Sequence, residues 1–227
     1  MAEQQKYRSE SKHCINIADC IELRSRLKYI AKPDPNALQD GCYKIRSLYF
    51  DNYEDKAVTD KLSGLSRREK FRLRYYNGDI SFIRLEKKSK INKGCHKETA
   101  AITAAQCEDI LKGCYDSLLS QDSPLLSELY AKMRYQNLRP RMIVDYMREA
   151  YIYPAGNVRV TIDRDVRSSG NITGFLNPDI PTVPSANAII LEIKYDTFLP
   201  DIIRNIVQLN NREATEFSKY VVSRFVL

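Results

Sequence analysis

The segment from Glu69 to Tyr76 alternates charged and apolar side chains, and this alternation constrains the fold more than any other feature of the sequence. Side chains two residues apart lie on the same face of a β-strand. The segment therefore predicts a strand with three cations on one face and three apolar side chains on the other. The cations are Lys70, Arg72 and Arg74, and the apolar residues are Phe71, Leu73 and Tyr75.

Four further segments repeat this pattern. Their charged faces carry Arg84, Glu86 and Lys88; Arg8, Glu10 and Lys12; Arg159 with Asp163; and Glu192 with Lys194. For any single strand, an ordinary sheet with one solvent-exposed face explains the alternation. Exposed faces usually mix Thr, Ser and Gln with Lys, however, whereas these faces are mainly Arg, Lys and Glu. The repetition favours a sheet whose charged side chains converge on an enclosed interior.

Seven segments in all are predicted to be strands from their alternation. Asn77-Gly78 separates two of them, which is a strong hairpin signal, so these two should pair antiparallel. The predicted strands are Tyr7–Ile15, Lys44–Phe50, Glu69–Tyr76, Ile80–Lys88, Arg141–Ala150, Val158–Asp163 and Ile189–Tyr195.

Helices are predicted between these strands from capping residues followed by apolar stripes. The predicted starts are Asn16, a capping box of Thr103 and Gln106, Ser123 followed by Pro124, and Pro200. An antiparallel sheet closed into a barrel, with charges inside and helices outside, would shield both kinds of face. We therefore predict an α+β fold, an antiparallel β-barrel with helices packed outside.

The domain organisation is predicted to be simple. No change of composition divides residues 1–227, so we expect a single domain. Residues 165–188 are rich in Gly, Pro, Asn and Ser and are predicted to be a long loop. This loop is either an exposed insertion, which we favour, or a mobile lid.

The charge of the chain points to an anionic partner. Thirty-six Lys and Arg against 29 Asp and Glu leave a net charge of +7, although a basic balance can also serve solubility alone. A cation-lined interior would repel itself without a polyanion, and the planar fork of arginine suits phosphate. There is no GxxxxGK[ST] and no GxGxxG motif, so side chains must hold the phosphates.

Several other classes of protein are disfavoured by the sequence. The six cysteines show no CxxC spacing, and only two histidines are present, which argues against a zinc site or a His-centred triad. No run approaches the ~20 apolar residues of a membrane segment, and the polar start lacks the apolar stretch of a secretory signal. We therefore expect a cytoplasmic protein.

Nine short motifs resemble one known family in order along nearly the whole chain. The family is the catalytic domain of the vacuolar transporter chaperone (VTC) complex and its bacterial stand-alone relatives, the polyphosphate polymerases. It belongs to the CYTH-like triphosphate tunnel metalloenzymes. The motifs are Arg8-Ser-Glu-Ser-Lys12, Ser47-Leu-Tyr-Phe-Asp51, Lys70-Phe-Arg-Leu-Arg74, Leu85-Glu-Lys-Lys88, Lys97-Glu98, Tyr146-Met-Arg148, Val158-Arg-Val-Thr-Ile-Asp163, Leu191-Glu-Ile-Lys194 and Phe217-Ser-Lys219-Tyr220.

The resemblance implies a metal-dependent phosphotransferase that moves the terminal phosphate of ATP onto inorganic polyphosphate, with phosphate or pyrophosphate as a first acceptor. It implies a tunnel with catalytic cations at Lys12, Arg72, Arg74, Lys88, Arg148, Arg159 and Lys219. Substrate-binding residues are predicted at Glu10, Lys70, Arg84, Lys97, Tyr146, Lys194 and Ser218. No nucleic acid partner is expected.

A divalent metal is expected from the acidic members of the charged faces. Carboxylates are hard oxygen ligands suited to Mg²⁺ or Mn²⁺, although each of these could instead be a salt-bridge partner of neighbouring cations. The candidates are Glu10, Glu86, Asp163 and Glu192. The resemblance marks Glu192 as the metal-binding carboxylate.

Two other functions stay open at this point. A tunnel-fold triphosphatase would use the same cations to direct water at a phosphate. The first strand of such hydrolases resembles the pattern Glu-x-Glu-x-Lys. Here Arg8 stands in place of the first Glu, which favours phosphoryl transfer over hydrolysis. A non-catalytic polyanion-binding module is the second alternative, and metal-dependent ATP turnover would distinguish it from either enzyme.

Overall fold

The computed structural model describes residues 8–92, 94–209 and 212–226. The chain forms two compact units, each built from three separate segments. The first unit comprises the described parts of Met1–Lys44, Tyr146–Val166 and Ala186–Ser218. The second comprises those of Ile45–Asp145, Arg167–Ser185 and Lys219–Leu227. No helix in the described ranges is long and apolar enough to cross a membrane.

The strands pair antiparallel in the order β1-β10-β8-β7-β3-β4-β5-β6, with β2 on β7 and β9 on β8. Strands β3, β7 and β8 contribute residues to both units. The bounds are β1 Ser9–Ile15, β2 Lys32–Pro33, β3 Cys42–Asp51, β4 Arg67–Tyr76, β5 Asp79–Ile91, β6 Gly94–Ile102, β7 Arg139–Tyr153, β8 Val158–Ser169, β9 Val183–Ala186 and β10 Ile189–Tyr195.

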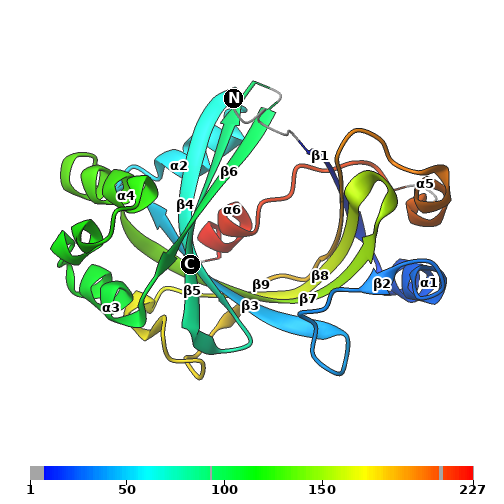
Figure 1. The fold of residues 1–227 in the computed structure, drawn as a ribbon, viewed down its shortest axis with the longest axis horizontal. Coiled ribbons are helices and arrows are strands. Elements are labelled where there is room, and N and C mark those ends of the chain that lie inside the picture. The colour runs from blue at the N-terminus through cyan, green and yellow to red at the C-terminus, as the bar shows by residue number, and fades with distance from the viewer. Residues whose placement is uncertain (1–7, 93, 210–211, 227) are drawn as a thin grey trace. The chain divides into compact units, whose positions relative to one another are not determined.

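In the first unit, two helices lie side by side and bury the apolar face of the strands (Figure 1). These are α1 (Ile17–Leu27) and α5 (Asp201–Val207). Asn16 caps α1 as predicted, in a capping box that Asp19 completes. Leu23 of α1 and Ile203 of α5 pack in one core with Val160, and this fixes which face of β8 turns away from the helices.

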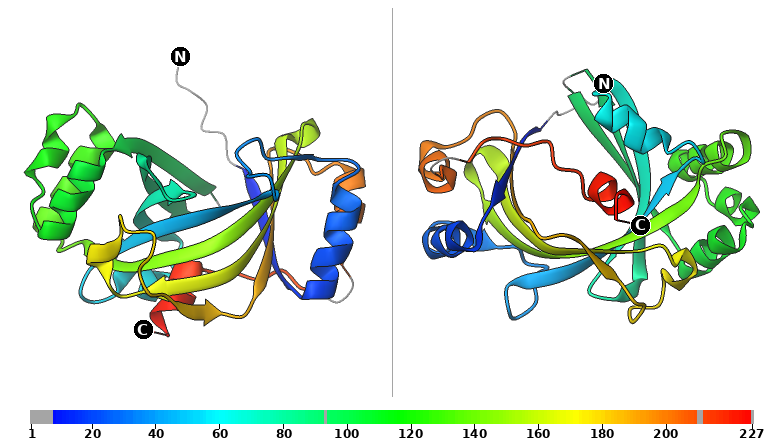
Figure 2. Two further views of the ribbon diagram at one scale, coloured as in Figure 1. Left: turned by 90° about the horizontal axis from the view of Figure 1, so that it is seen from below. Right: turned by 180° about the vertical axis from the view of Figure 1, so that it is seen from behind.

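In the second unit, α3 (Ala104–Lys112), the 3₁₀ turn η1 (Asp116–Ser120) and α4 (Pro124–Tyr135) cover the apolar face of β4 and β5 (Figures 1 and 2). The predicted Thr103–Gln106 capping box is present. Leu73 and Leu85 of the strands pack against Ile110 and Leu129 of the helices. Arg72, Arg74 and Glu86 therefore lie on the face opposite these helices, whereas Glu69 and Lys87 pair with Lys132 and Glu128 of α4.

The predicted α+β class and antiparallel sheet are confirmed, and all seven predicted strands are present, one with the predicted bounds and six with shifted bounds. Tyr7, where the first was predicted to start, lies outside the described residues. Strand β6 was missed, as were the short helices α2 (Lys56–Leu62) and α6 (Lys219–Arg224). The segment Gly94–Ile102 escaped because its exposed residues do not alternate with large apolar ones. The single-domain assignment stays a prediction.

The prediction of a loop over residues 165–188 is partly wrong. Its first residues continue β8 to Ser169, and β9 pairs with β8 later in the segment. The part between is fixed by the second unit: Tyr75 donates a hydrogen bond to the Phe175 carbonyl (2.7 Å), and the Phe175 ring is fully buried. Arg46 also donates to the carbonyls of Asn177 and Pro178. These contacts explain why the turn-rich composition does not produce an irregular loop throughout.

Candidate functional site

The first cluster of charged side chains lies on one face of the first unit. Register pairs Lys12 of β1 with Glu192 of β10, which in turn pairs with Thr161 of β8. The neighbouring row joins Glu10, Lys194 and Arg159. We use the name first cluster for Glu10, Lys12, Arg148, Arg159, Asp163, Glu192 and Lys194.

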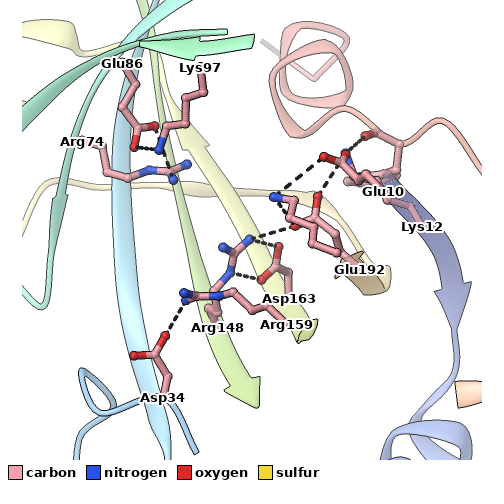
Figure 3. Close-up of polar contacts among 12 residues, drawn as sticks. Glu10, Lys12, Asp34, Arg74, Glu86, Lys97, Arg148, Arg159, Asp163 and Glu192 are labelled. Atoms are coloured by element: carbon pink, nitrogen blue, oxygen red, sulfur yellow. Dashed lines mark hydrogen bonds and ion pairs between the residues drawn. The ribbon is translucent and has the colours of Figure 1, made fainter. Parts of the chain in front are cut away.

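Two lysines and two glutamates of this cluster are interleaved (Figure 3). Lys12 Nζ lies 2.8 Å from Glu10 Oε1 and 3.5 Å from Glu192 Oε1, while Lys194 Nζ lies 3.2 Å from Glu192 Oε2. Burial alone would lower the pKa of Lys12, but Glu192 and Glu10 outweigh it and raise that pKa. The two glutamates thus favour the charged form of Lys12.

Arg148 forms a bidentate ion pair in the first cluster. Its Nε and Nη2 donate to both oxygens of Asp163 at 2.6 and 2.7 Å, and Nη2 lies 3.7 Å from Glu192 Oε2 (Figure 3). The guanidinium also lies over the Tyr146 ring, 5.4 Å from its centroid. Burial would lower the pKa of Arg148, yet Asp163 and its other partners raise it well above its usual value. The bidentate pair fixes the direction of the guanidinium.

Arg159 is held by two groups that sequence analysis did not single out. Its Nη2 lies 2.5 Å from Asp34 Oδ2 and donates to the Tyr43 hydroxyl at 2.7 Å. Asp34 is 2% exposed, so the arginine is anchored from beneath by a buried carboxylate. Asp34 sits just after β2 in a Pro-rich stretch, where no alternation signals its orientation.

The second cluster lies on the charged face of the second unit. Its members by strand register are Ser47, Tyr49, Lys70, Arg72, Arg74, Glu86, Lys88 and Lys97. Glu86 accepts from Arg72 Nε at 2.6 Å. It also accepts from Lys97 Nζ at 2.6 Å and lies 3.5 Å from Arg74 Nη1 (Figure 3). Burial would raise the pKa of Glu86, but Arg72, Arg74 and Lys97 lower it far below its usual value.

Two further contacts orient the arginines of the second cluster. Arg74 Nε donates to Ser47 Oγ at 3.1 Å, and Arg72 Nη1 donates to the Tyr49 hydroxyl at 3.1 Å. Neither Ser47 nor Tyr49 was among the predicted site residues. They lie two residues apart in a predicted strand and therefore share one face of it. That face of the strand has no charged residue that could mark it as part of a site.

The other predicted site residues are distributed as follows. Lys70, Lys88 and Lys97 occupy one register row of β4, β5 and β6. Arg84 pairs in register with Arg74 but is exposed, with its guanidinium 4.6 Å from the Phe82 ring centroid. Ser218 belongs to the first unit and Lys219 opens α6 in the second.

Arg8, the residue that distinguishes the first strand from the hydrolase pattern, has a structural partner. Its Nε lies 3.0 Å from Asp196 Oδ1, and its Nη2 donates to the Asn157 carbonyl at 2.5 Å. Both partners belong to the first unit. Asp196 and the Asn157 carbonyl thus fix the position of the Arg8 guanidinium.

The carboxylates of the two clusters differ in whether they could bind a divalent metal. Within residues 8–92, 94–209 and 212–226, no three His, Cys, Asp or Glu side chains are grouped to hold an ion. Asp163 and Glu86 are each occupied by arginine. Glu192 and Glu10 pair with Lys12 and Lys194 and not with a bidentate arginine. Mg²⁺ is typically bound by one or two carboxylates together with substrate phosphates. The donor set therefore fits a metal that arrives with a phosphate ligand.

Comparison with known proteins gives the same fold. The model of the VTC domain matches residues 7–227. None of the curated proteins matches the chain in sequence. Among solved structures, HpAC1 from Hippeastrum, named as an adenylyl cyclase and found to have a dominant triphosphatase activity, is 12% identical with a TM-score of 0.58, over 97% of this chain and 96% of that chain.

Two further structures are similar at lower scores. One is a Pyrococcus horikoshii protein, at 12% identity and a TM-score of 0.48 over 96% of this chain and 98% of that chain. The other is named as an adenylate cyclase of Bacillus halodurans, at 11% identity and 0.48 over 86% and 82%. At such identities the likeness to HpAC1 shows the fold alone, and it confirms the predicted triphosphate tunnel fold.

Proposed function

Because the chain belongs to the VTC domain family, we propose that it is a polyphosphate polymerase, which transfers the terminal phosphate of ATP to the end of a growing inorganic polyphosphate chain. Family and fold together support a protein that handles phosphoryl groups. The finer assignment rests on the charged faces of the two units.

The observation that carries the proposal is the charge of the second cluster. Among the described residues of β4, β5 and β6, the cations of this face surround a single carboxylate, that of Glu86. Cations gathered on one face of a sheet repel one another. A polyanion such as polyphosphate relieves that repulsion along its whole length. The cations are Lys70, Arg72, Arg74, Lys88 and Lys97.

The reaction needs no proton transfer from the protein. A terminal oxygen of phosphate, pyrophosphate or polyphosphate, already ionised, attacks the terminal phosphorus of ATP. One P–O bond forms, the bond to the β-phosphate oxygen breaks, and ADP leaves with that electron pair. Positioning and charge neutralisation supply the acceleration. This is consistent with the absence of histidine from both clusters as defined above.

The roles of the predicted cations follow from their contacts. Arg148, fixed by Asp163, and Arg159, fixed by Asp34, are held ready to donate to phosphate oxygens without reorganising. Arg72 and Arg74 do the same in the second cluster. We propose that Glu192, with Glu10, holds Mg²⁺ or Mn²⁺. A bound metal would neutralise phosphate charge.

A tunnel-fold triphosphatase is the second candidate, since HpAC1 has that activity. Against it stands Arg8, which replaces the first Glu of the hydrolase pattern in the first strand and pairs with Asp196. Such a carboxylate would help to bind metal or orient water. Hydrolysis is therefore expected as a side reaction.

The test is to incubate the purified protein with ATP and Mn²⁺ and to resolve the products by gel electrophoresis and phosphate assay. Long phosphate chains with stoichiometric ADP support the polymerase. Orthophosphate as the main product would replace it with the triphosphatase. Salt-sensitive binding of polyphosphate without ADP formation would show a binding module. Arg204→Ala, at an exposed ion pair on α5, serves as a control that should leave every product unchanged.

A further inference from the structure

Tyr49 is buried on the charged face of the second unit in contact with a predicted catalytic cation. Tyr49 is 3% exposed, and its hydroxyl accepts a hydrogen bond from Arg72 Nη1 at 3.1 Å. Its ring stacks on that of Tyr220 from α6, with centroids 4.9 Å apart and an interplanar angle of 21°. The stacking fixes the ring and so aims the hydroxyl at Arg72.

The charged groups around Tyr49 are mostly cations. From β4 they are Lys70, Arg72 and Arg74, from β5 Glu86, and from β6 Lys97. From β3 and α6 come Asp51 and Tyr220, and the Tyr220 hydroxyl donates to Asp51 Oδ2 at 2.9 Å.

The pKa values of the two stacked tyrosines are therefore shifted in opposite directions. Burial would raise the pKa of Tyr49, but Arg72, Lys70 and Arg74 outweigh it and lower that pKa to about 7. Burial and Asp51 instead raise the pKa of Tyr220 far above its usual value. Tyr220 remains a neutral donor, whereas Tyr49 is poised to supply a negative charge to the cation cluster.

We propose that Tyr49 is a positioning residue: as a phenolate it is, beside Glu86, a second internal counter-ion of Arg72, and it yields Arg72 Nη1 to a phosphate oxygen of the incoming polyanion while taking up a proton from solvent. This inference rests on the proposed function only in that its ligand is a linear phosphate chain. The step is a protonation, in which the phenolate oxygen and a solvent proton form the O–H bond. Binding of phosphate adds negative charge beside Tyr49 and so favours its neutral form.

The sign of the pH dependence follows from this exchange. The ligand-bound state carries the proton on Tyr49 and the free state carries it only below a pH of about 7. Affinity for a phosphate chain should therefore fall as pH rises above 7, by up to about tenfold per pH unit from this group alone. Tyr49→Phe removes this component, and the difference between the two proteins isolates it from titration of the ligand.

The experiment uses tripolyphosphate as the probe, on the full chain, with Tyr49→Phe and the exposed Tyr135→Phe as a matched control. Calorimetry in two buffers of different ionisation enthalpy counts the protons taken up at pH 7.5. Absorbance at 295 nm follows the phenolate. We expect wild type and Tyr135→Phe to take up a fraction of one proton more than Tyr49→Phe, and to lose 295 nm absorbance on binding.

Equal proton uptake in wild type and Tyr49→Phe would overturn the inference, as would a failure of tripolyphosphate to bind. If Tyr49→Phe does not fold, the absorbance of wild type at 295 nm tests the inference by itself. No phenolate titrating near pH 7, or one that persists at saturating tripolyphosphate, would contradict the inference. Proton-linked binding of tripolyphosphate without polymer synthesis would instead contradict the proposed function. It would still support Tyr49 as a positioning residue for Arg72.

Discussion

The two charged clusters differ in how their charges are balanced. In the first cluster each cation faces a carboxylate: Lys12 and Lys194 face Glu10 and Glu192, Arg148 faces Asp163, and Arg159 faces Asp34. In the second, the cations of three strands share Glu86. The first cluster thus balances its cations with carboxylates of its own unit, whereas we propose that a polyanionic ligand binds the cations of the second.

The largest effect is expected from Arg74→Ala. Arg74 is 5% exposed and lies between Ser47 and Glu86, so it is both buried and aimed at the charged face. Its loss should lower polymer synthesis by roughly 100- to 1000-fold, the usual effect of removing one preorganised charge-stabilising donor. ADP release and chain length report the loss, and circular dichroism shows whether the fold survives. An unfolded variant would mean that Arg74 is structural.

Removing one acid from each cluster tests the charge comparison directly. Glu86→Gln and Asp163→Asn should each lower the free energy of unfolding by roughly 3–5 kcal/mol, because each removes the charged partner of a buried ion pair. Tripolyphosphate should restore much more stability to Glu86→Gln, whose cluster has the larger positive excess. Thermal melts with and without tripolyphosphate measure this difference. Equal rescue of the two variants would refute the distinction between the clusters.

The depressed pKa of Glu86 adds a pH dependence to the same comparison. A carboxylate whose pKa is lower in the folded state contributes stability at neutral pH that is lost as pH falls below its unfolded value of about 4.3. Wild type should therefore lose more stability than Glu86→Gln between pH 5 and acid conditions. Urea melts across that range provide the test, and parallel curves for the two proteins would count against it.

A smaller effect, on metal requirement, is expected from Glu192→Gln in the first cluster. The substitution keeps the shape but weakens the oxygen donor, so the Mn²⁺ concentration for half-maximal synthesis should rise about tenfold, or ~1.4 kcal/mol. Glu22→Gln on the exposed surface of α1 is the matched control. An unchanged titration for Glu192→Gln would remove this residue from the proposed metal site.

The parts of the site that sequence predicts are those on regular strands. Alternation alone places Lys70, Arg72 and Arg74 on one face, because the period of a strand is two and the core demands the opposite face. Asp34 was missed because it follows a strand of two residues, and its contact with Arg159 joins positions far apart in sequence. Strand pairing, on which such contacts depend, is not encoded in local periodicity.

The smallest effect is expected from a substitution of Thr161 in the first cluster. It pairs with Glu192 on the charged face, is 2% exposed, and its hydroxyl has no hydrogen-bond partner among the described residues. A buried hydroxyl without a partner costs roughly 1–3 kcal/mol, so Thr161→Val, which keeps the shape, should stabilise the protein by up to about 1 kcal/mol. Thermal melts measure the gain. If Thr161→Val gained stability but lost affinity for tripolyphosphate, the hydroxyl would be a ligand contact, and the first cluster would also be completed by its ligand.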